Sequence, residues 1–349
     1  MFDISKVFIS SEILRLIAEI DEFKGAWQLL GRLTSEKLQQ LRKVATIESI
    51  GSSTRIEGSQ LSDRDVEKLL SNLEMYSFIS RDEQEVAGYA FVSEEIFQGF
   101  ESIDFSENVI KQLHRWLLKY SDKDERHRGD YKKLASNIEA FDATGKSLGV
   151  VFKTTSPFQT PFKMQELILW TNLQLEQKTL HPLLIIGIFI VEFLAIHPFQ
   201  DGNGRLSRIL TSLLLLKSGY LYVPYSSLES IIERSKDSYY LALRKTQVTL
   251  ELDSPDFTPW LLFFLRALQK QKIHLEQKVN REKTLLLHIP ELSARIITLL
   301  HEHGRLGITE LEIMTKANRN TLKKYMSDLV VSGSIMRFGK GRATWYALP

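Results

Sequence analysis

Apolar residues recur at spacings of three and four along most of this 349-residue chain. Residues three or four apart lie on one face of a helix, so this spacing is typical of amphipathic helices. It predicts a mainly α-helical protein with few strands before residue 285. The clearest helical segments are Glu36–Glu48, Val109–Tyr120, Lys163–Gln177, Leu183–Ala195 and Leu206–Ser218.

The length of the chain predicts two or three compact units. A turn cluster at Asp253–Pro259 precedes a long helix from Trp260, and this helix becomes charged and poor in apolar residues over Gln269–Lys283. We interpret that stretch as a connector. The expected division is an N-terminal helical region at 1–100, a central core at 101–250, connector helices at 251–284 and a C-terminal unit at 285–349.

The last 65 residues have a pattern of their own. We expect three helices at Leu292–His303, Ile308–Thr315 and Asn318–Ser332, followed by two short strands at Ser334–Gly339 and Ala343–Ala347. Three helices and a terminal hairpin suggest a winged helix-turn-helix. Its basic residues suit DNA phosphates, but the charge is modest, and a protein-interaction or dimerisation helix is the alternative. They are Arg319, Lys323, Lys324, Arg337, Lys340 and Arg342.

A β-hairpin is predicted in the middle of the helical region. The segment Gly149–Thr155 has strand character and follows the turn-like stretch Asp142–Lys146. Pro157 and Pro161 then end the hairpin and lead into the next helix.

The composition excludes several kinds of chemistry. The chain has no cysteine, so disulfides, thiolate catalysis and cysteine-based zinc sites are ruled out. The net charge of +2 decides nothing about partners. Met1–Lys6 lacks the apolar core of a signal peptide. The apolar runs Leu183–Ile196 and Trp260–Leu265 are too short to cross a bilayer. We expect a soluble cytoplasmic protein with no membrane partner.

The segment from His197 to Arg208 joins two strongly apolar helices and combines several chemical groups. Pro198 disfavours helical geometry at the residue before it, and the next helix opens after Gly202-Asn203-Gly204. A glycine-rich loop at a helix N-terminus offers free N–H groups and the positive end of the helix dipole. It is therefore an anion-binding nest.

Other groups needed for phosphate chemistry surround this nest. Asp201 is a hard oxygen ligand suited to Mg²⁺, and Arg205 and Arg208 can meet phosphate oxygens from one helix face. His197 can accept a proton at pH 7, and Phe199 anchors the loop in the core. This reasoning leaves nucleotidyl and phosphoryl transfer open.

The string HPFQDGNGRLSR resembles the motif H-x-F-x-[DE]-G-N-G-R-x-x-R of the Fic (filamentation induced by cAMP) domain family, and every fixed position matches. The resemblance extends to about residue 270. It implies a helical bundle that transfers a nucleotide monophosphate, usually AMP from ATP with Mg²⁺, to Ser, Thr or Tyr of a protein. The core at 101–250 would then be the catalytic unit.

The same resemblance implies roles by motif position. His197 would be the general base and Asp201 the Mg²⁺ ligand. The nucleotide would contact the stretch from Gly202 to Arg208, with Arg205 and Arg208 as the phosphate clamp. The residues of this set are Gly202, Asn203, Gly204, Arg205, Leu206, Ser207 and Arg208, with Tyr239, Tyr240 and Gln247 near adenine and ribose.

Two further segments resemble parts of the family. The hairpin at Ser147–Thr155 corresponds to the flap, along which a target segment pairs as an added strand. The pattern Ser53-x-x-x-Glu57-Gly58 resembles the N-terminal (class II) inhibitory motif, on a helix ending near Gly58. A carboxylate aimed at Arg208 would occupy the cation meant for the γ-phosphate.

Several alternatives remain open at this stage. The chain could be a nucleotide-sensing DNA-binding regulator, although a sensor would not need His197. The family's phosphotransferases replace the second loop glycine with lysine, so Gly204 favours nucleotidyl transfer. Transfer of another nucleotide such as UMP, removal of AMP with Glu57 positioning water, self-modification and homodimer formation are also compatible with the sequence.

Overall fold

The computed structural model describes residues 7–29, 35–71, 78, 80–136, 138–141, 147–287, 291–331, 333–339, 341 and 344–348. It is mainly helical, as predicted. The chain forms two compact units, Met1–Leu275 and Glu276–Pro349.

Helices and one hairpin build the first unit. In chain order the helices are α1 (Ser11–Leu29), α2 (Ser35–Ile56), α3 (Asp63–Ser71), α4 (Arg81–Gly99), α5 (Glu107–Leu117), η2 (Glu125–His127), α6 (Thr160–Gln177), α7 (Pro182–Ile196), α8 (Asn203–Lys217), η3 (Val223–Tyr225), α9 (Leu228–Arg234), α10 (Lys236–Gln247) and α11 (Thr258–Leu287).

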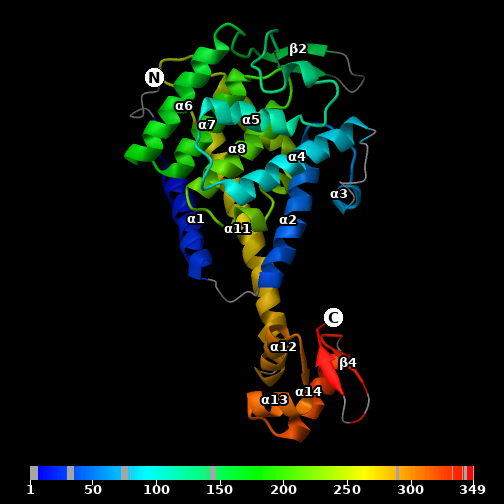
Figure 1. The fold of residues 1–349 in the computed structure, drawn as a ribbon. Coiled ribbons are helices and arrows are strands. Elements are labelled where there is room, and N and C mark those ends of the chain that lie inside the picture. Colours follow the sequence, from blue (N-terminus) through cyan, green and yellow to red (C-terminus); the bar gives the residue numbers. More distant parts are fainter. Residues whose placement is uncertain are drawn as a thin grey trace. The chain divides into compact units, whose positions relative to one another are not determined.

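The core of the first unit is organised around α7. Every residue from Leu183 to Ile196 is buried, and α7 packs against α6, α8 and α10 (Figure 1). A helix that is apolar on all sides must be enclosed by other elements. Trp260 of α11 donates from its indole Nε1 to the Gly187 carbonyl of α7 at 2.7 Å.

The start of α11 corrects the expectation of a connector. Leu261, Leu265 and Leu268 are fully buried, and the first compact unit extends to Leu275. The apolar period at the start of this helix therefore serves the core. The segments expected at 1–100 and 101–250 also pack together in this one unit.

The hairpin lies between the helices as predicted. Strand β1 (Ile138–Phe141) pairs antiparallel with β2 (Ser147–Phe152), with Ile138 opposite Phe152. The expected turn Asp142–Lys146 lies outside the described residues. Pro161 then stands in the first turn of α6, where its missing N–H costs no hydrogen bond.

The second unit has the predicted helices and one more strand than expected. Its elements are α12 (Glu291–His303), β3 (Arg305–Gly307), α13 (Ile308–Thr315), α14 (Arg319–Val331), β4 (Met336–Phe338) and β5 (Trp345–Ala347). The strands form an antiparallel sheet in the order β3-β5-β4. Strand β3 has three residues, too few for an apolar period to reveal.

The core of this unit is apolar and made by all three helices and the sheet. Its buried residues are Ile296, Leu300, Leu306, Leu311, Leu322, Met326, Leu329 and Ile335. Among the basic residues predicted to face a partner, Lys340 and Arg342 lie outside the residues whose side chains are described.

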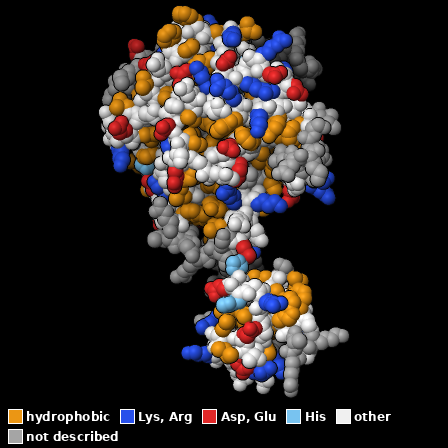
Figure 2. Space-filling model, in the orientation of Figure 1, with side chains coloured by type: hydrophobic (Ala, Val, Ile, Leu, Met, Phe, Trp, Pro, Cys, Tyr) orange, Lys and Arg blue, Asp and Glu red, His pale blue; other side chains and the backbone are white. Residues whose placement is uncertain are grey.

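The surface carries both signs of charge. Figure 2 shows acidic and basic side chains interspersed with apolar ones on the visible face of the first unit. Among the described helices, none combines the length and the apolar content needed to span a bilayer.

Candidate active site

The predicted loop joins the C-terminus of α7 to the N-terminus of α8. His197 follows α7 in the left-handed conformation, with φ of 53° and ψ of 61°. Gly202 precedes α8 with φ of 79°, a value that favours glycine. The two left-handed residues, His197 and Gly202, turn the chain between the C-terminus of α7 and the N-terminus of α8. We call residues His197–Asn203 the catalytic loop.

The side chain of Asn203 holds this loop together. Its Oδ1 accepts from the Phe199 N–H at 2.9 Å, and its Nδ2 donates to the Phe199 carbonyl at 2.8 Å. Asn203 is 2% exposed and Phe199 is fully buried. The sequence placed Asn203 in the phosphate cradle, but its amide is already committed to the backbone. Only its main-chain N–H remains for an anion. Phe199 anchors the loop, as predicted.

His114 of α5 supports the loop from below. Its ring stacks on Phe199 with centroids 3.8 Å apart. Its Nδ1 accepts from the Gly129 N–H at 2.8 Å, so Nε2 carries the proton and donates to the Asp201 carbonyl at 3.0 Å. Burial lowers the pKa of His114 to about 4. The ring is therefore a neutral structural member of the site at pH 7.

The imidazole of His197 is also neutral. Burial, followed by the charge of Lys132, lowers its pKa to about 4. Its Nδ1 is buried and has no hydrogen-bond partner among the described residues. A neutral imidazole with an uncommitted nitrogen can accept a proton. This is the protonation state expected of a general base at pH 7.

The carboxylate of Asp201 lies between cations. Its Oδ2 is 3.0 Å from an Arg81 guanidinium nitrogen, and its Oδ1 is 3.3 Å from one of Arg205. Oδ1 also accepts from the Gly202 N–H at 2.6 Å. Burial raises the pKa of this carboxyl, but the charge of Arg205 and the Gly202 N–H outweigh burial and lower it. Asp201 is therefore ionised.

Asp201 fits the way in which magnesium is bound with nucleotides. The described residues contain no group of three or more acidic or imidazole side chains that could enclose a metal. Mg²⁺ commonly uses one or two carboxylates together with substrate phosphates. The side chain of Asp201 is 30% exposed, so one ionised oxygen ligand is accessible at the loop. Arg81, which is half exposed, would have to share or release it.

Arg205 and Arg208 pair with different carboxylates in this structure. Arg205 is 2% exposed and pairs with Glu85 of α4 at 3.1 Å as well as with Asp201. Arg208 pairs with Glu57 instead. A spacing of three residues places both arginines on one face of α8, as predicted. Each guanidinium nevertheless turns toward a different carboxylate. Arg205 therefore orients Asp201 in this structure.

Two more residues of the predicted nucleotide set face the protein. Leu206 is fully buried, and its N–H is bonded to the Gly202 carbonyl at 2.9 Å. The Ser207 hydroxyl donates to the Gly204 carbonyl at 2.7 Å. The N–H groups that open α8 belong to Asn203, Gly204 and Arg205, and these groups could bind an anion.

Arg208 meets the end of α2. One terminal nitrogen of its guanidinium is 2.7 Å from Glu57 Oε1 and 2.9 Å from the Ser53 carbonyl, and its Nε donates to the Ser53 hydroxyl at 2.8 Å. Burial alone would lower the pKa of Arg208, but the charge of Glu57 raises it. Its other terminal nitrogen, Nη1, is buried without a partner among the described residues.

Glu57 also covers the start of α8. A Cβ placed on Gly204 would lie 2.2 Å from Glu57 Oε1. The carboxylate therefore stands against the glycine whose small size opens the anion site. The two residues are 147 positions apart in sequence, so this contact exists only in the folded chain.

The end of α2 is shaped to present Glu57. The helix ends at Ile56, and Gly58 follows with φ of 109°. Such a glycine lets the chain leave the helix at once. Arg55 then holds the helix end to α9, with Nε 2.6 Å and Nη2 3.0 Å from the Glu233 carboxylate. The prediction that the helix carrying this motif ends near Gly58 agrees with the structure.

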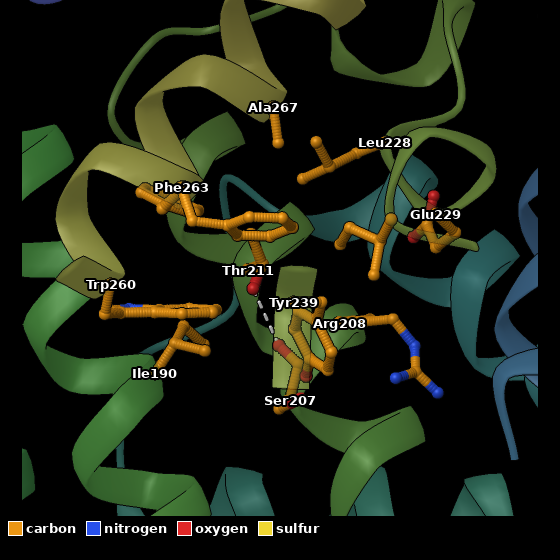
Figure 3. Close-up of a pocket in the computed structure, with 12 residues that line it drawn as sticks. Ile190, Ser207, Arg208, Thr211, Leu228, Glu229, Tyr239, Trp260, Phe263 and Ala267 are labelled. Carbon is orange, nitrogen blue, oxygen red and sulfur yellow. Dashed lines mark hydrogen bonds between the residues drawn. The ribbon is translucent and has the colours of Figure 1, made fainter. Parts of the chain in front are cut away.

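The predicted nucleoside residues differ in exposure. Tyr239 is 3% exposed and packs edge-on against Trp260 at 5.7 Å. Figure 3 shows the Tyr239 ring beside Arg208. Trp260 and Phe263 line the same pocket. Tyr240 is 45% exposed, so its face is open to a ligand. Gln247 is buried and lines a separate cavity of about 830 Å³.

Sequence reasoning missed four residues of this site. They hold the predicted residues rather than a ligand, and their partners lie far away in the chain. A histidine on an apolar helix face was the one available signal, at His114. The four are Arg81, Glu85, His114 and Lys132.

Comparison with known proteins places this geometry in a family. A model of the Fic/DOC family matches residues 104–215, which include the catalytic loop and most of α8. Residues 104–215 therefore form a Fic/DOC-family domain. A second model, of a bacterial protein family of unknown function (DUF977), matches residues 286–343.

Curated relatives of the chain are named protein adenylyltransferase Fic. The one from Drosophila virilis is 24% identical over 299 residues, covering 83% of this chain and 57% of that protein. The one from Drosophila melanogaster is 27% identical over 210 residues, covering 59% and 39%. The chain thus spans about half the length of the curated relatives it matches.

Solved structures share the Fic fold. A Fic family protein from Desulfovibrio desulfuricans has a TM-score of 0.62 and 24% identity, covering 98% of this chain and 97% of that one. A fragment of Fic-1 from C. elegans has a TM-score of 0.59 and 20% identity, covering 78% and 72%. The first likeness covers both units of the chain.

Proposed function

We propose that this chain is an autoinhibited protein AMP-transferase that moves AMP from ATP to a Ser, Thr or Tyr hydroxyl of a protein, including itself. The catalytic loop supplies the groups for this reaction. His197 is the base, Asp201 the magnesium ligand, and the N-terminus of α8 the phosphate site. Relatives named protein adenylyltransferase support the reaction class.

The carrying observation is the position of Glu57. Its carboxylate binds Arg208 at 2.7 Å and lies against Gly204 at the opening of α8. A nucleotide phosphate in this place would need the same cation and the same N–H groups. Arg208 Nη1, buried and unpartnered among the described residues, is a donor that such a phosphate would satisfy. Glu57 therefore competes with the γ-phosphate for Arg208.

The reaction follows from these positions. His197 takes the proton of the target hydroxyl while the hydroxyl oxygen attacks the α-phosphorus, and the bond to the β-phosphate oxygen breaks to release pyrophosphate. Positioning and charge neutralisation carry most of the rate. A Mg²⁺ ion held by Asp201 would neutralise phosphate charge. Arg205 keeps Asp201 oriented through its ion pair.

The first experiment measures transfer of labelled AMP by the purified chain with ATP and Mg²⁺. Glu57→Gly should raise the rate about tenfold or more, because one charged contact to Arg208 is lost. Glu101→Gly, a change of the same kind in an exposed turn, serves as the control. If Glu57→Gly has the rate of the parent and of this control, autoinhibition by Glu57 is wrong.

The second experiment removes the base. His197→Ala in the Glu57→Gly background should reduce transfer about 10²–10⁴-fold, the usual contribution of a general base. Running ATP, CTP, GTP and UTP side by side on Glu57→Gly identifies the nucleotide. Transfer that survives His197→Ala would refute the base assignment, and a preference for UTP would replace AMP with UMP.

Removal of AMP is a second candidate, and one observation favours it. The charge of Glu57 raises the pKa of His197, so the two groups are within electrostatic reach. A carboxylate there could orient water toward a phosphodiester. With AMP-modified chain as substrate, AMP release that depends on Glu57 would support this candidate. Release that is equal in Glu57→Gly would contradict it.

Partners belong to the same proposal. The target segment would pair along Ser147–Thr155, the segment that contains β2, and two copies of the chain could associate. The second unit exposes Arg319, Lys323 and Lys324 on α14, a basic face suited to DNA phosphates or an acidic protein. Replacing these three with glutamine in the full chain should abolish a salt-dependent DNA shift. If the parent chain causes no DNA shift, both DNA binding and the role of a nucleotide-sensing DNA-binding regulator are excluded.

A further inference from the structure

Lys132 is a buried lysine next to the catalytic loop. It lies between η2 and β1 and is 3% exposed. Its Nζ donates to the Thr154 hydroxyl at 2.7 Å and to the Ile196 carbonyl at 3.0 Å, and both partners are neutral. Burial lowers the pKa of this amine to about 8. Burying an ammonium group against neutral partners opposes folding, which points to a role other than stability.

The contacts of Lys132 bracket His197. Its side chain binds the carbonyl of the preceding residue, Ile196, and its own N–H binds the carbonyl of the following residue, Pro198, at 2.8 Å. His197 has a left-handed backbone, a conformation that is strained for a non-glycine residue. Ile196 also ends α7, where carbonyls lack helical partners and a cation is favourable. Lys132 thus fixes the peptide groups on both sides of the imidazole.

The same amine reaches the base of the hairpin. The Thr154 hydroxyl that accepts from Lys132 donates in turn to the Ser136 carbonyl at 3.0 Å. Ser136 precedes β1 and Thr154 follows β2, so the pair closes the foot of the hairpin. One nitrogen therefore connects the foot of the β1–β2 hairpin to the backbone of the catalytic loop.

We propose that Lys132 is a positioning residue that sets the backbone of His197 and fixes the hairpin relative to it. A target segment paired along β2 would then present its hydroxyl at a constant distance from the imidazole. This inference rests on the proposed function, since it concerns how the base and the target meet. Proximity of this kind governs the chemical step more than nucleotide binding.

The test uses the full chain in the Glu57→Gly background, with the His197→Ala chain as acceptor. Lys132→Met removes the donor and the charge at similar length. We expect kcat to fall about tenfold to hundredfold while the KM for ATP stays within about twofold. Lys132→Arg should restore most of the loss. Lys133→Met, a change at the exposed neighbour, should leave both constants at the parent values.

Thr154→Val separates the two connections, because it removes the hairpin contact and keeps the bond to Ile196. It should raise the KM for the acceptor chain and leave the KM for ATP unchanged. Equal kcat in Lys132→Met and Lys133→Met would overturn the proposal, as would a loss confined to ATP affinity. Should Lys132→Met fail to fold, an unchanged acceptor KM in Thr154→Val gives the same negative answer.

A readout independent of turnover separates this inference from the proposed function. In ¹³C-histidine spectra the His197 resonances, assigned by their loss in His197→Ala, should shift in Lys132→Met and not in Lys133→Met. Lys132, Glu57 and Asp201 are the charges that act on this ring. A shift of the His197 resonances without detectable transfer would support the positioning role of Lys132 and contradict the proposed AMP transfer. Unshifted resonances with active enzyme would sink the positioning alone.

Discussion

The catalytic loop and the end of α2 meet at Arg208, but the two regions are held in different ways. The loop is fixed by buried hydrogen bonds from Asn203, His114 and Lys132, which come from three parts of the chain. Glu57 has a side chain that is one-third exposed, and its carboxylate accepts a hydrogen bond from Arg208.

This difference accords with the proposed roles, in which the catalytic loop is fixed and the inhibitory carboxylate of Glu57 can be displaced. We expect the loop groups to keep their geometry when a nucleotide binds, because their hydrogen bonds are internal to the fold. The Glu57 contact depends on one charge pair that a phosphate can replace. The helix end that carries it is retained by a second ion pair, from Arg55 to Glu233. Three substitutions test this contrast.

The largest effect should come from Asn203→Ala, which removes hydrogen bonds that hold the catalytic loop. The loss of both hydrogen bonds to the Phe199 backbone frees the loop, so AMP transfer in the Glu57→Gly background should fall about a hundredfold. Asn172→Ala is the matched control, since that amide donates to the Phe105 carbonyl away from the loop. A rate equal to that of Asn172→Ala would show that the loop does not need its clamp.

A second effect concerns the neutral histidine under the loop. The pKa of His114 is about 4 in the fold, against 6.5 for a free histidine. The unfolded chain therefore binds a proton between these values and the folded chain does not. The free energy of unfolding should fall by on the order of 2–3 kcal/mol as the pH drops from 6.5 to 4.

Denaturant unfolding of the parent and of His114→Gln, followed by tryptophan fluorescence at several pH values, measures how the free energy of unfolding depends on pH. The variant should lose less stability on acidification than the parent. The control is His301→Gln, at an exposed position of the second unit. If the free energy of unfolding depends on pH in the same way in His114→Gln and the parent, the assignment of a buried neutral imidazole at His114 is wrong.

The smallest effect should come from Glu233→Gln, which loosens the removable region. Arg55 keeps a neutral partner but loses the charge pair, so the end of α2 releases Glu57 more often. With Glu57 intact, AMP transfer should rise about fivefold, equal to about 1 kcal/mol for a partly exposed pair. Glu251→Gln provides an exposed control. A rate that stays at the parent level would mean that Arg55 does not retain the inhibitor.

Much of the fold could be predicted because helical periods are local. The apolar pattern of α7 and α8 identified both helices, and glycine and proline marked the loop between them. Strand β3 was missed because three residues carry no period. The start of α11 was taken for a connector because its charged second half dominated the reading, although its first half is core.

The site was predicted in kind but not in detail. The sequence places His197, Asp201 and Arg208 within one segment of twelve residues, which must lie close together. It could not tell which of their neighbours face a ligand. Asn203, Leu206 and Ser207 were predicted to meet the nucleotide, yet their side chains face the backbone or the core.

The sequence by itself determined the chemistry of the loop and the presence of a carboxylate motif at Glu57. The tertiary structure alone decided the pairing of Glu57 with Arg208, the separation of Arg205 from Arg208, and the place of Lys132 beside His197. The physical reason is that local patterns fix which face a residue occupies on its own element. The partner across the interface comes from a distant element, and only packing brings the two together.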